Sequence, residues 1–266
     1  MKIETLVDSL AGEFGDDLVE EVLRDARRGF AQALERIRRP QAVLGVVKSP
    51  LGDLLVAATG RGVVLNHYLR DAADLAAALA HLRIHFDLIE DRDAAEEIAD
   101  EVRRYVGGDA GALRRQVDLS LAQSAFQKKV LTKLLAVPRG AVISYQALGA
   151  AVGSPNAARA IGNAMHHNPV PIYVPCHRVI KSDGTIGNYG GGIARKLKLL
   201  GAEGFRADRG NRLPGTAVYG HWASRIFCRP ACTSVRRASR KRWLIFGDSA
   251  HARGAGLRAC KICHPA

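Results

Sequence analysis

The feature that most constrains this chain is a proline-punctuated segment at residues 168–180, with the sequence NPVPIYVPCHRVI. Pro169, Pro171 and Pro175 exclude a regular helix and restrict the backbone of the residues before them. The apolar run at 172–174 predicts a short buried strand or extended segment. The residue that follows Pro175 is therefore held in a fixed place.

That residue is Cys176, and His177 and Arg178 come directly after it. A thiol beside cationic groups has a lowered pKa and forms a nucleophilic thiolate more readily. The sequence thus predicts a reactive cysteine. The alternative is a small buried hydrophobic residue, which is what most free cysteines are. These residues alone favour neither reading.

The length of 266 residues allows one large domain or two or three smaller ones. The N-terminal residues contain no apolar run typical of a signal peptide, and no segment is apolar enough to span a membrane. We therefore expect a cytoplasmic protein with no membrane partner. Because disulfides are rare in that compartment, the five cysteines need another explanation.

The formal net charge is +13, and it is unevenly distributed. Residues 1–118 carry 16 Lys+Arg and 22 Asp+Glu, residues 119–205 carry 10 and 2, and residues 206–266 carry 13 and 2. Only the second and third regions are basic, which predicts that they face a polyanion. Nucleic acid is the expected partner. An anionic membrane is the weaker alternative, because no basic amphipathic helix stands out.

The first 118 residues predict a helical extension followed by a small α/β domain. Residues 1–40 have an apolar helical stripe, interrupted by Gly12 and Gly15, and no residues that suggest chemistry. Residues 41–118 predict three strands joined by glycine-bearing turns and then two helices, at 42–47, 53–58, 63–69, about 71–88 and 93–106. We expect this domain to serve as structural support.

Residues 119–205 predict short helices. One spans 125–135, and Ser144 is a plausible N-cap for a second at 145–152. Ser154, with proline next to it, predicts the start of a third that runs to Met165. Two short helices joined by a glycine turn are typical of a helix-turn-helix, and the charge favours DNA as its ligand. The alternative is an alanine-rich core helix with a solvated Arg159.

Together these pieces resemble the O6-alkylguanine-DNA alkyltransferase family over about residues 43–205. The matching residues are Phe126-Gln127, Ser144-Tyr145, Ala158-Arg159-Ala160-Ile161-Gly162, Asn168-Pro169-Val170-Pro171-Ile172, Pro175-Cys176-His177-Arg178-Val179, Gly187-Asn188-Tyr189 through Gly192, and Glu203-Gly204. The resemblance implies a ribonuclease-H-like N-terminal domain at 41–118 and a catalytic, DNA-binding domain at 119–205.

The resemblance also implies a direct displacement. Cys176 would accept the alkyl group from guanine O6, with O4-alkylthymine as a further substrate, and would keep it as a thioether, so that each molecule acts once. His177 would hold a water against the thiol, and Glu203 would orient and charge-balance His177. Tyr145 and Lys196 would assist the departing guanine. No cofactor is expected for this transfer.

The remaining family positions support the cysteine and bind DNA. Asn168 would brace the turn that carries Cys176, whereas Arg178 is expected to be structural. The positions expected to contact DNA or the flipped base are Ala158, Arg159, Ala160, Tyr189 and Gly190. Arg159 would fill the gap that base flipping leaves, from a helix in the minor groove. Glycine at 190, in place of serine, predicts a pocket that tolerates bulkier alkyl groups. The expected partner is double-stranded alkylated DNA, bound by a monomer.

Beyond an expected linker at 206–218 lie two close cysteine pairs, Cys228 with Cys232 and Cys260 with Cys263. Such pairs in a reducing compartment are typical of tetrahedral zinc, which would supply much of the folding energy of so small a segment. The alternative is four unrelated buried cysteines. Residues 219–266 therefore predict a zinc module.

This region resembles the zinc domain of the bacterial adaptive-response protein Ada, through residues 226–232 and 255–265. The resemblance implies that Cys228 takes a methyl group from a DNA methylphosphotriester while it ligates zinc. The domain lies after the alkyltransferase here rather than before it, and no further DNA-binding region follows, so a transcriptional role is not expected. Structural zinc with a nonspecific grip on DNA is the alternative.

The sequence thus predicts a single-turnover DNA-repair alkyltransferase, a methylated-DNA–protein-cysteine S-methyltransferase, with an appended zinc module. Two other classes compete with it. A noncatalytic DNA binder or damage sensor would use the helix-turn-helix and the zinc module, and the combination of Cys176, His177 and Glu203 argues against it. A cysteine hydrolase would need turnover and an oxyanion site, which no motif indicates.

Overall fold

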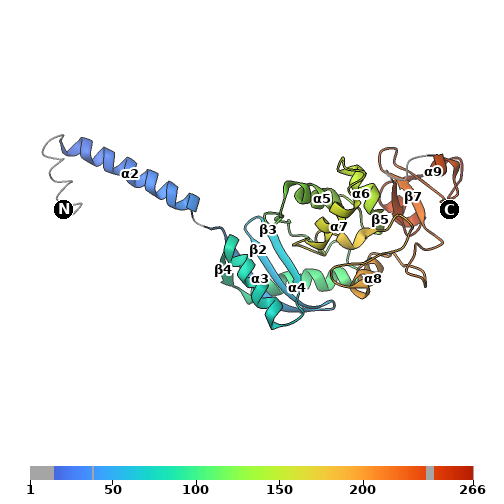
Figure 1. Ribbon diagram of the computed structural model, residues 1–266, viewed down its shortest axis with the longest axis horizontal. Helices are drawn as coiled ribbons and strands as arrows, with labels where there is room; N and C mark the ends of the chain where they lie inside the picture. Colours follow the sequence, from blue (N-terminus) through green and yellow to red (C-terminus); the bar gives the residue numbers. More distant parts are fainter. Residues whose placement is uncertain (1–14, 38, 238–242, 266) are drawn as a thin grey trace.

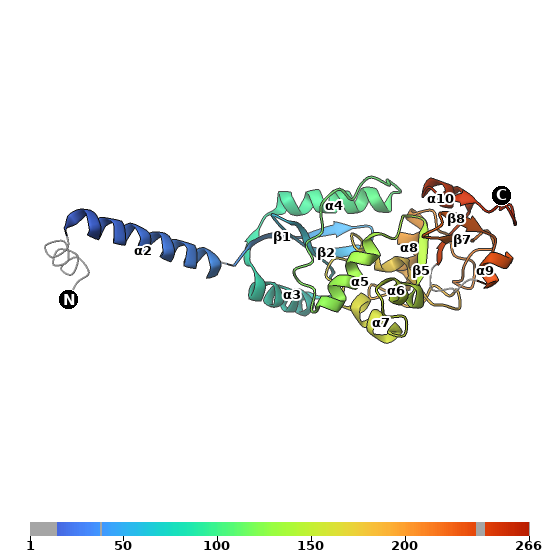
Figure 2. The ribbon, with the colours of Figure 1, turned by 90° about the horizontal axis from the view of Figure 1, so that it is seen from above.

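The computed structural model describes residues 15–37, 39–237 and 243–265. It has two β-sheets, with strand orders β3-β2-β1-β4 and β10-β8-β7-β9-β5-β6, and helices around both. The predicted mixed α/β class is confirmed. The helix α2 (Asp16–Ile37) projects from one end of the folded body. The cysteine-rich region, which comprises the described residues from 218 to 265, lies at the other end (Figures 1 and 2).

The first sheet contains the three predicted strands, β1 (Gln41–Ser49), β2 (Gly52–Thr59) and β3 (Gly62–Tyr68), paired antiparallel in sequence order. Helix α3 (Ala72–His85) covers one face and α4 (Arg92–Val106) the other (Figure 2). Aspartate side chains cap both helices, Asp71 at the amide of Asp74 and Asp91 at the amide of Ala94. These caps explain where the helices begin.

The prediction of one helix over 71–88 is wrong at its end. Helix α3 stops at His85, and β4 (Asp87–Glu90) then pairs parallel with β1. The strand is short and lacks a strong apolar pattern, so its own sequence does not indicate it. The open edge of β1 supplies its hydrogen-bonding partner, which is a tertiary effect.

The middle of the chain forms α5 (Ala125–Leu135), β5 (Ala141–Ser144), α6 (Tyr145–Ala151) and α7 (Ala158–His166). Ser144 caps α6 as predicted, by accepting a hydrogen bond from the amide of Ala147. The predicted start of α7 at Ser154 is wrong. Residues 154–157 form a turn in which the Ser154 carbonyl accepts from the amide of Ala157, and α7 begins at Ala158 without a side-chain cap.

The proline-rich segment is buried as predicted, but 172–174 is a turn rather than a strand. Ile172 has a φ of 78°, and an isolated bridge joins Pro171 to Val174 across the turn. The 3₁₀ turn η1 (Cys176–Arg178) follows, and it leads directly into β6 (Val179–Ile180). The reactive segment is thus a tight buried turn that ends on a 3₁₀ turn.

The second sheet extends from this turn into the cysteine-rich region. After α8 (Ile193–Ala202) come β7 (Val218–His221), β8 (Ile226–Cys228), α9 (Thr233–Arg237), β9 (Trp243–Phe246), α10 (Ser249–Gly254) and β10 (Arg258–Ala259). Strand β9 pairs antiparallel with β5, and β5 pairs parallel with β6. One hydrophobic core contains Cys176 and Val179 together with Phe227, Leu244 and Phe246.

Candidate active site and cysteine cluster

Cys176 lies buried at the start of η1, with 7% of its surface exposed. The Asn168 amide nitrogen donates to the carbonyl oxygen of Val174 and to the Cys176 sulfur, at 3.1 Å each. The Asn168 oxygen accepts from the amide of Val170 at 3.1 Å. One side chain thus bridges both ends of the proline-rich turn and contacts the thiol.

A buried polar cluster lies directly behind the thiol. His177 Nε2 lies 2.5 Å from Glu203 Oε1, and neither side chain is exposed to solvent. Arg178 Nε lies 2.9 Å from Glu203 Oε2, and its Nη2 lies 3.0 Å from Oε1. Tyr105 donates its hydroxyl to the same carboxylate, and the Gly140 amide donates to Oε2 at 3.3 Å. The carboxylate is surrounded by donors.

These contacts set the charges of the cluster. Burial acts to raise the pKa of Glu203, but His177 and Arg178 outweigh it and hold that pKa well below its ordinary range. Burial lowers the pKa of His177, and Glu203 offsets this only in part. Arg178 therefore balances the glutamate charge, which leaves His177 neutral and able to accept a proton.

The pKa of the Cys176 thiol differs from the sequence prediction. Burial raises the pKa of Cys176, and hydrogen bonds from Asn168 and Tyr189 and the charge of Lys196 lower it only in part. The expected lowering by neighbouring cations is wrong because the Arg178 guanidinium points at Glu203 and His177 is neutral. The resting cysteine is a thiol, and its reaction requires a base.

Cys176 opens into a pocket of about 510 Å³. Its walls come from β3, from the loop after α7 and from the glycine run 190–192. Tyr189 and Tyr68 meet across it, with their hydroxyl oxygens 3.0 Å apart, and the Arg195 guanidinium lies 4.8 Å from the Tyr68 ring centroid. A Cβ at Gly190 would meet open space. The predicted pocket residues Tyr189 and Gly190 therefore line the same cavity as Cys176.

Lys196 and Tyr145 lie outside the residues that line this pocket. Lys196 is fully buried and donates to the carbonyl oxygens of Val179 at 2.6 Å and Ile186 at 2.7 Å. Burial lowers its pKa to about 8, and electrostatic attraction to the Cys176 sulfur offsets this only in part. Tyr145 is half-buried at the start of α6, and burial raises its pKa. The Lys196 ammonium therefore binds backbone carbonyl oxygens and does not line the cavity.

Ala158, Arg159 and Ala160 form the exposed first turn of α7. The turn between α6 and α7 contains Gly153 with a φ of +81°, a conformation that favours glycine. Between these two small residues, Arg159 is the long side chain of this turn.

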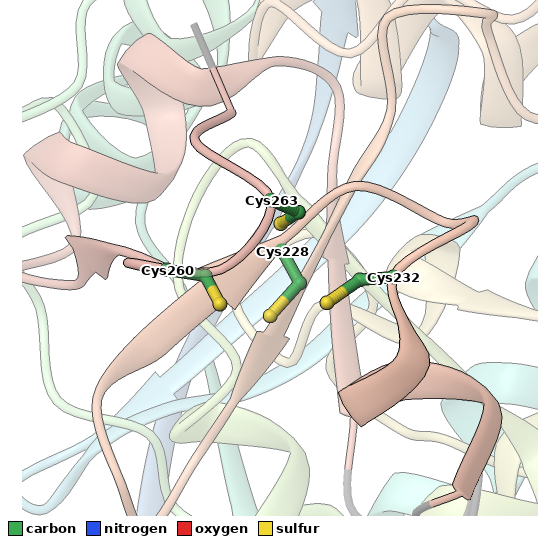
Figure 3. A group of neighbouring side chains, drawn as sticks. All are labelled: Cys228, Cys232, Cys260 and Cys263. Carbon is green, nitrogen blue, oxygen red and sulfur yellow. The ribbon is translucent and has the colours of Figure 1, made fainter.

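The four remaining cysteines converge in space. Their sulfur atoms all lie within 4.8 Å of one another, and Figure 3 shows them directed toward a common point. Backbone amides donate to two of them, Arg229 N to Cys263 Sγ at 3.3 Å and Ile262 N to Cys260 Sγ at 3.4 Å. Four sulfur ligands with N–H···S support suit a tetrahedral zinc ion.

The sequence reasoning missed contributions from the N-terminal domain. Tyr105 contacts Glu203, Tyr68 lines the pocket, and Asn66 donates to the Pro171 carbonyl oxygen at 3.0 Å. No sequence signal separates these side chains from ordinary packing residues, because their partners lie far away in the chain. The domain predicted to be support also builds the site.

Comparison with known proteins matches the region around Cys176 and the region of the cysteine cluster to two different families. The family described as the 6-O-methylguanine DNA methyltransferase DNA-binding domain matches residues 125–205, and the metal-binding domain of Ada matches 205–266. A methylated-DNA–protein-cysteine methyltransferase of Mycobacterium bovis is 38% identical over 161 residues, which cover 60% of this chain and 92% of that protein. The chain belongs to this family. Both resemblances seen in the sequence are confirmed.

This chain aligns with a smaller share of other relatives. The human methylated-DNA–protein-cysteine methyltransferase is 50% identical over 101 residues, which are 38% of this chain and 49% of the human protein. The chain thus spans about half the length of the mammalian relatives it matches. The crystal structure of Mycobacterium tuberculosis O6-methylguanine methyltransferase aligns with a TM-score of 0.51 at 33% identity, over 64% of this chain and 96% of that one.

Proposed function

We propose that this protein repairs O6-alkylguanine in double-stranded DNA by moving the alkyl group to Cys176, once per molecule. The observation that carries the proposal is the buried His177–Glu203 pair behind a buried thiol that opens into a cavity. Family membership supports the same reaction. O4-alkylthymine is a further proposed substrate, because thymine O4, like guanine O6, lies on the major-groove edge of the base and carries the alkyl group as an ether.

The transfer is a displacement at carbon. Cys176 Sγ forms a bond to the alkyl carbon while the bond from that carbon to O6 breaks, and guanine leaves as its ordinary lactam. Because burial raises the pKa of the thiol, its proton must first pass to a base. His177 Nδ1 is buried and has no protein partner in the described chain, so it is the atom that would hold the relaying water. The thiol proton finally reaches N1 of the guanine, which restores the lactam and balances the loss of the alkyl group from O6.

The leaving base needs hydrogen-bond donors. Tyr145 is proposed to donate to the departing guanine, since burial raises its pKa and keeps its hydroxyl protonated. Lys196 is proposed to act indirectly: its ammonium binds the carbonyls of Val179, Ile186 and Asn188 and so orders the loop that carries Tyr189. Asn168 is proposed to position the thiol.

Binding of DNA is proposed through α6 and α7 as a helix-turn-helix. The exposed small residues Ala158 and Ala160 would let the backbone approach the minor groove, and Arg159 would fill the space left by the flipped base. The basic balance of residues 119–266 supports a polyanionic partner. The order β3-β2-β1-β4, with β4 parallel to β1, supports a ribonuclease-H-like topology for the N-terminal domain.

The cluster of Cys228, Cys232, Cys260 and Cys263 is proposed to hold one zinc ion, which would offset part of the negative charge of the thiolates and fasten β8 to the segment that follows β10. A second function, methylphosphotriester repair at Cys228, is favoured by the match to the Ada metal-binding domain. Cys228 is 2% exposed, so this reaction would require movement of the residues that cover it.

We also propose that the protein acts as a monomer in the cytoplasm. The proposed catalytic set is complete within one chain, and none of the five cysteines forms a disulfide bond, which is compatible with a reducing compartment. The described helices include none long and apolar enough to cross a membrane.

The test is intact-protein and peptide mass spectrometry after incubation of the zinc-loaded protein with duplex DNA that contains O6-methylguanine and methylphosphotriesters. One added methyl group on Cys176 supports base repair, and a second on Cys228 supports phosphotriester repair. Cys176→Ala should bind the same DNA and gain no methyl from guanine. Folded wild-type protein that binds DNA and remains unmethylated would instead indicate a damage sensor.

A further inference from the structure

We propose that His251 and strand β9 of the cysteine-rich region are positioning elements for the Cys176 site, acting through the backbone that holds Glu203. The inference rests on the alkyl transfer proposed above. The sequence predicts a separate module beyond a linker, and the two family matches meet at Phe205. The structure joins the two regions at the back of the catalytic cluster.

The first contact is a shared sheet. Strand β9 pairs with β5 in the register Ala141 with Phe246, Val142 with Ile245 and Ile143 with Leu244, and these six residues are at most 7% exposed. The other edge of β5 pairs with β6, which begins directly after η1. The cysteine-rich region therefore extends the sheet along the edge of β5 opposite β6, and Figure 2 shows its strands beside β5.

The second contact is the ring of His251, from α10. A Cβ built on Gly140 or on Gly204 would lie 2.4 Å from an atom of this ring, so the ring rests against both α-carbons. The two glycines have positive φ values of 74° and 82°. Asp248 Oδ1 accepts from the His251 amide and pairs with its Nδ1, at 2.8 Å each. The ring is anchored where it meets the glycines.

The two glycines lie next to the Glu203 carboxylate that positions His177. The Gly140 amide donates to Glu203 Oε2 at 3.3 Å, and Gly204 is the next residue after Glu203. The carbonyl of Gly140 accepts from the amide of Gly247, which directly follows β9. Loss of the His251 ring would free the backbone on both sides of Glu203 and shift the oxygen that holds His177 at 2.5 Å.

The cysteine-rich region therefore belongs to the same active site as Cys176, because it fixes the position of His177, the proposed general base. Misplacement by about 1 Å in a catalytic group can cost about 100-fold in rate. A ring that only restrains flanking backbone should cost less, about tenfold. DNA contacts on α7 should be unaffected, because His251 lies on a different element.

The experiment measures the single-turnover rate constant for transfer from O6-benzylguanine as the free base, which removes the DNA grip from the readout. The full-length variants are His251→Ala, His251→Phe and Asp248→Asn, with His81→Ala, at an exposed position of α3, as the matched control. We expect about a tenfold loss and a shifted pH–rate profile for His251→Ala, and rescue to within about twofold by the flat ring of His251→Phe. Asp248→Asn keeps the helix cap and should give a smaller loss.

Hydrogen exchange gives a second readout that does not depend on transfer. The amides around Gly140 and Glu203 should exchange faster in His251→Ala than in wild type or His81→Ala. The proposal is overturned if His251→Ala has the same transfer rate, pH–rate profile and amide exchange as wild type. That result would leave the proposed alkyl transfer itself intact. If wild type transfers no benzyl group, the same variants are compared with duplex DNA that contains O6-methylguanine. The proposed function fails if no transfer occurs with that DNA either, and the exchange pattern then decides the positioning role.

Discussion

Replacement of Arg178 by methionine tests the charge assignment of the buried cluster. The substitution keeps the aliphatic stem and removes three hydrogen bonds to Glu203, each 3.1 Å or shorter. The Arg178 side chain is 10% exposed and the Glu203 side chain is not exposed. Removal of one partner from a buried pair costs about 3–5 kcal/mol of unfolding free energy, and we expect that loss near neutral pH and above.

The loss should shrink as pH falls, for a reason that depends on His177. In wild type the folded pKa of His177 is lowered by burial, so the unfolded chain binds a proton that the folded one does not. Stability contributed by this group is present above about pH 6.5 and is lost as pH falls, at up to about 1.4 kcal/mol per unit. Without Arg178, His177 must balance the negative charge of Glu203. The pKa of His177 in the folded protein then rises above its pKa in the unfolded chain. Its contribution is then present below about pH 6.5 and lost as pH rises.

Urea denaturation of both proteins at about pH 5.5 and about pH 8 measures this difference, and carboxylates common to both cancel in the comparison. Arg103→Met is the matched control, because Arg103 pairs with Glu96 at 2.8 Å with 36% and 59% of the two side chains exposed. It should change stability by less than about 1 kcal/mol at either pH. An Arg178→Met penalty that stays equal at both pH values, or grows toward low pH, would refute a neutral His177 balanced by Arg178.

Four other changes test separate parts of the structure. Tyr105→Phe removes the hydroxyl donated to Glu203 and should cost about 1–2 kcal/mol in thermal or urea unfolding; an unchanged midpoint contradicts that contact. Lys196→Met removes the donor from the buried carbonyls of Val179 and Ile186, and we expect a loss of about 2–4 kcal/mol by the same assay, against none if the ammonium is dispensable. Zinc removal by a chelator, or Cys260→Ser, should lower Tm and release one equivalent of zinc by mass spectrometry; a metal-free protein of equal Tm argues against the site. Gly190→Ser should slow transfer from benzylated guanine at least about tenfold more than transfer from the methylated base, and equal slowing would show that its side chain does not limit pocket size.

The N-terminal domain has a larger share in the site than a supporting role implies. Its Asn66 binds the proline-rich turn through both its amide nitrogen and its side chain, Tyr68 forms one wall of the pocket, and Tyr105 reaches Glu203. Truncations that remove residues 41–118 should therefore be judged as changes to the active site, not as removal of a separate domain.

The sequence by itself determined the local features of this protein. Prolines set the tight segment before Cys176, Ser144 set the start of α6, glycine turns set the β1–β3 hairpins, and the paired spacing of cysteines predicted their cluster. Each depends on residues close together in the chain, where backbone restrictions and capping hydrogen bonds act directly.

Only the tertiary structure decided the chemistry of the site. The raised pKa of Cys176 and the lowered pKa of His177 come from burial and from the orientation of Arg178, which adjacency in the chain does not reveal. The strand β4 and the β5–β9 pairing each depend on a free sheet edge supplied by a distant segment. Local sequence limits which elements form, whereas desolvation and long-range pairing depend on what the completed fold places around them.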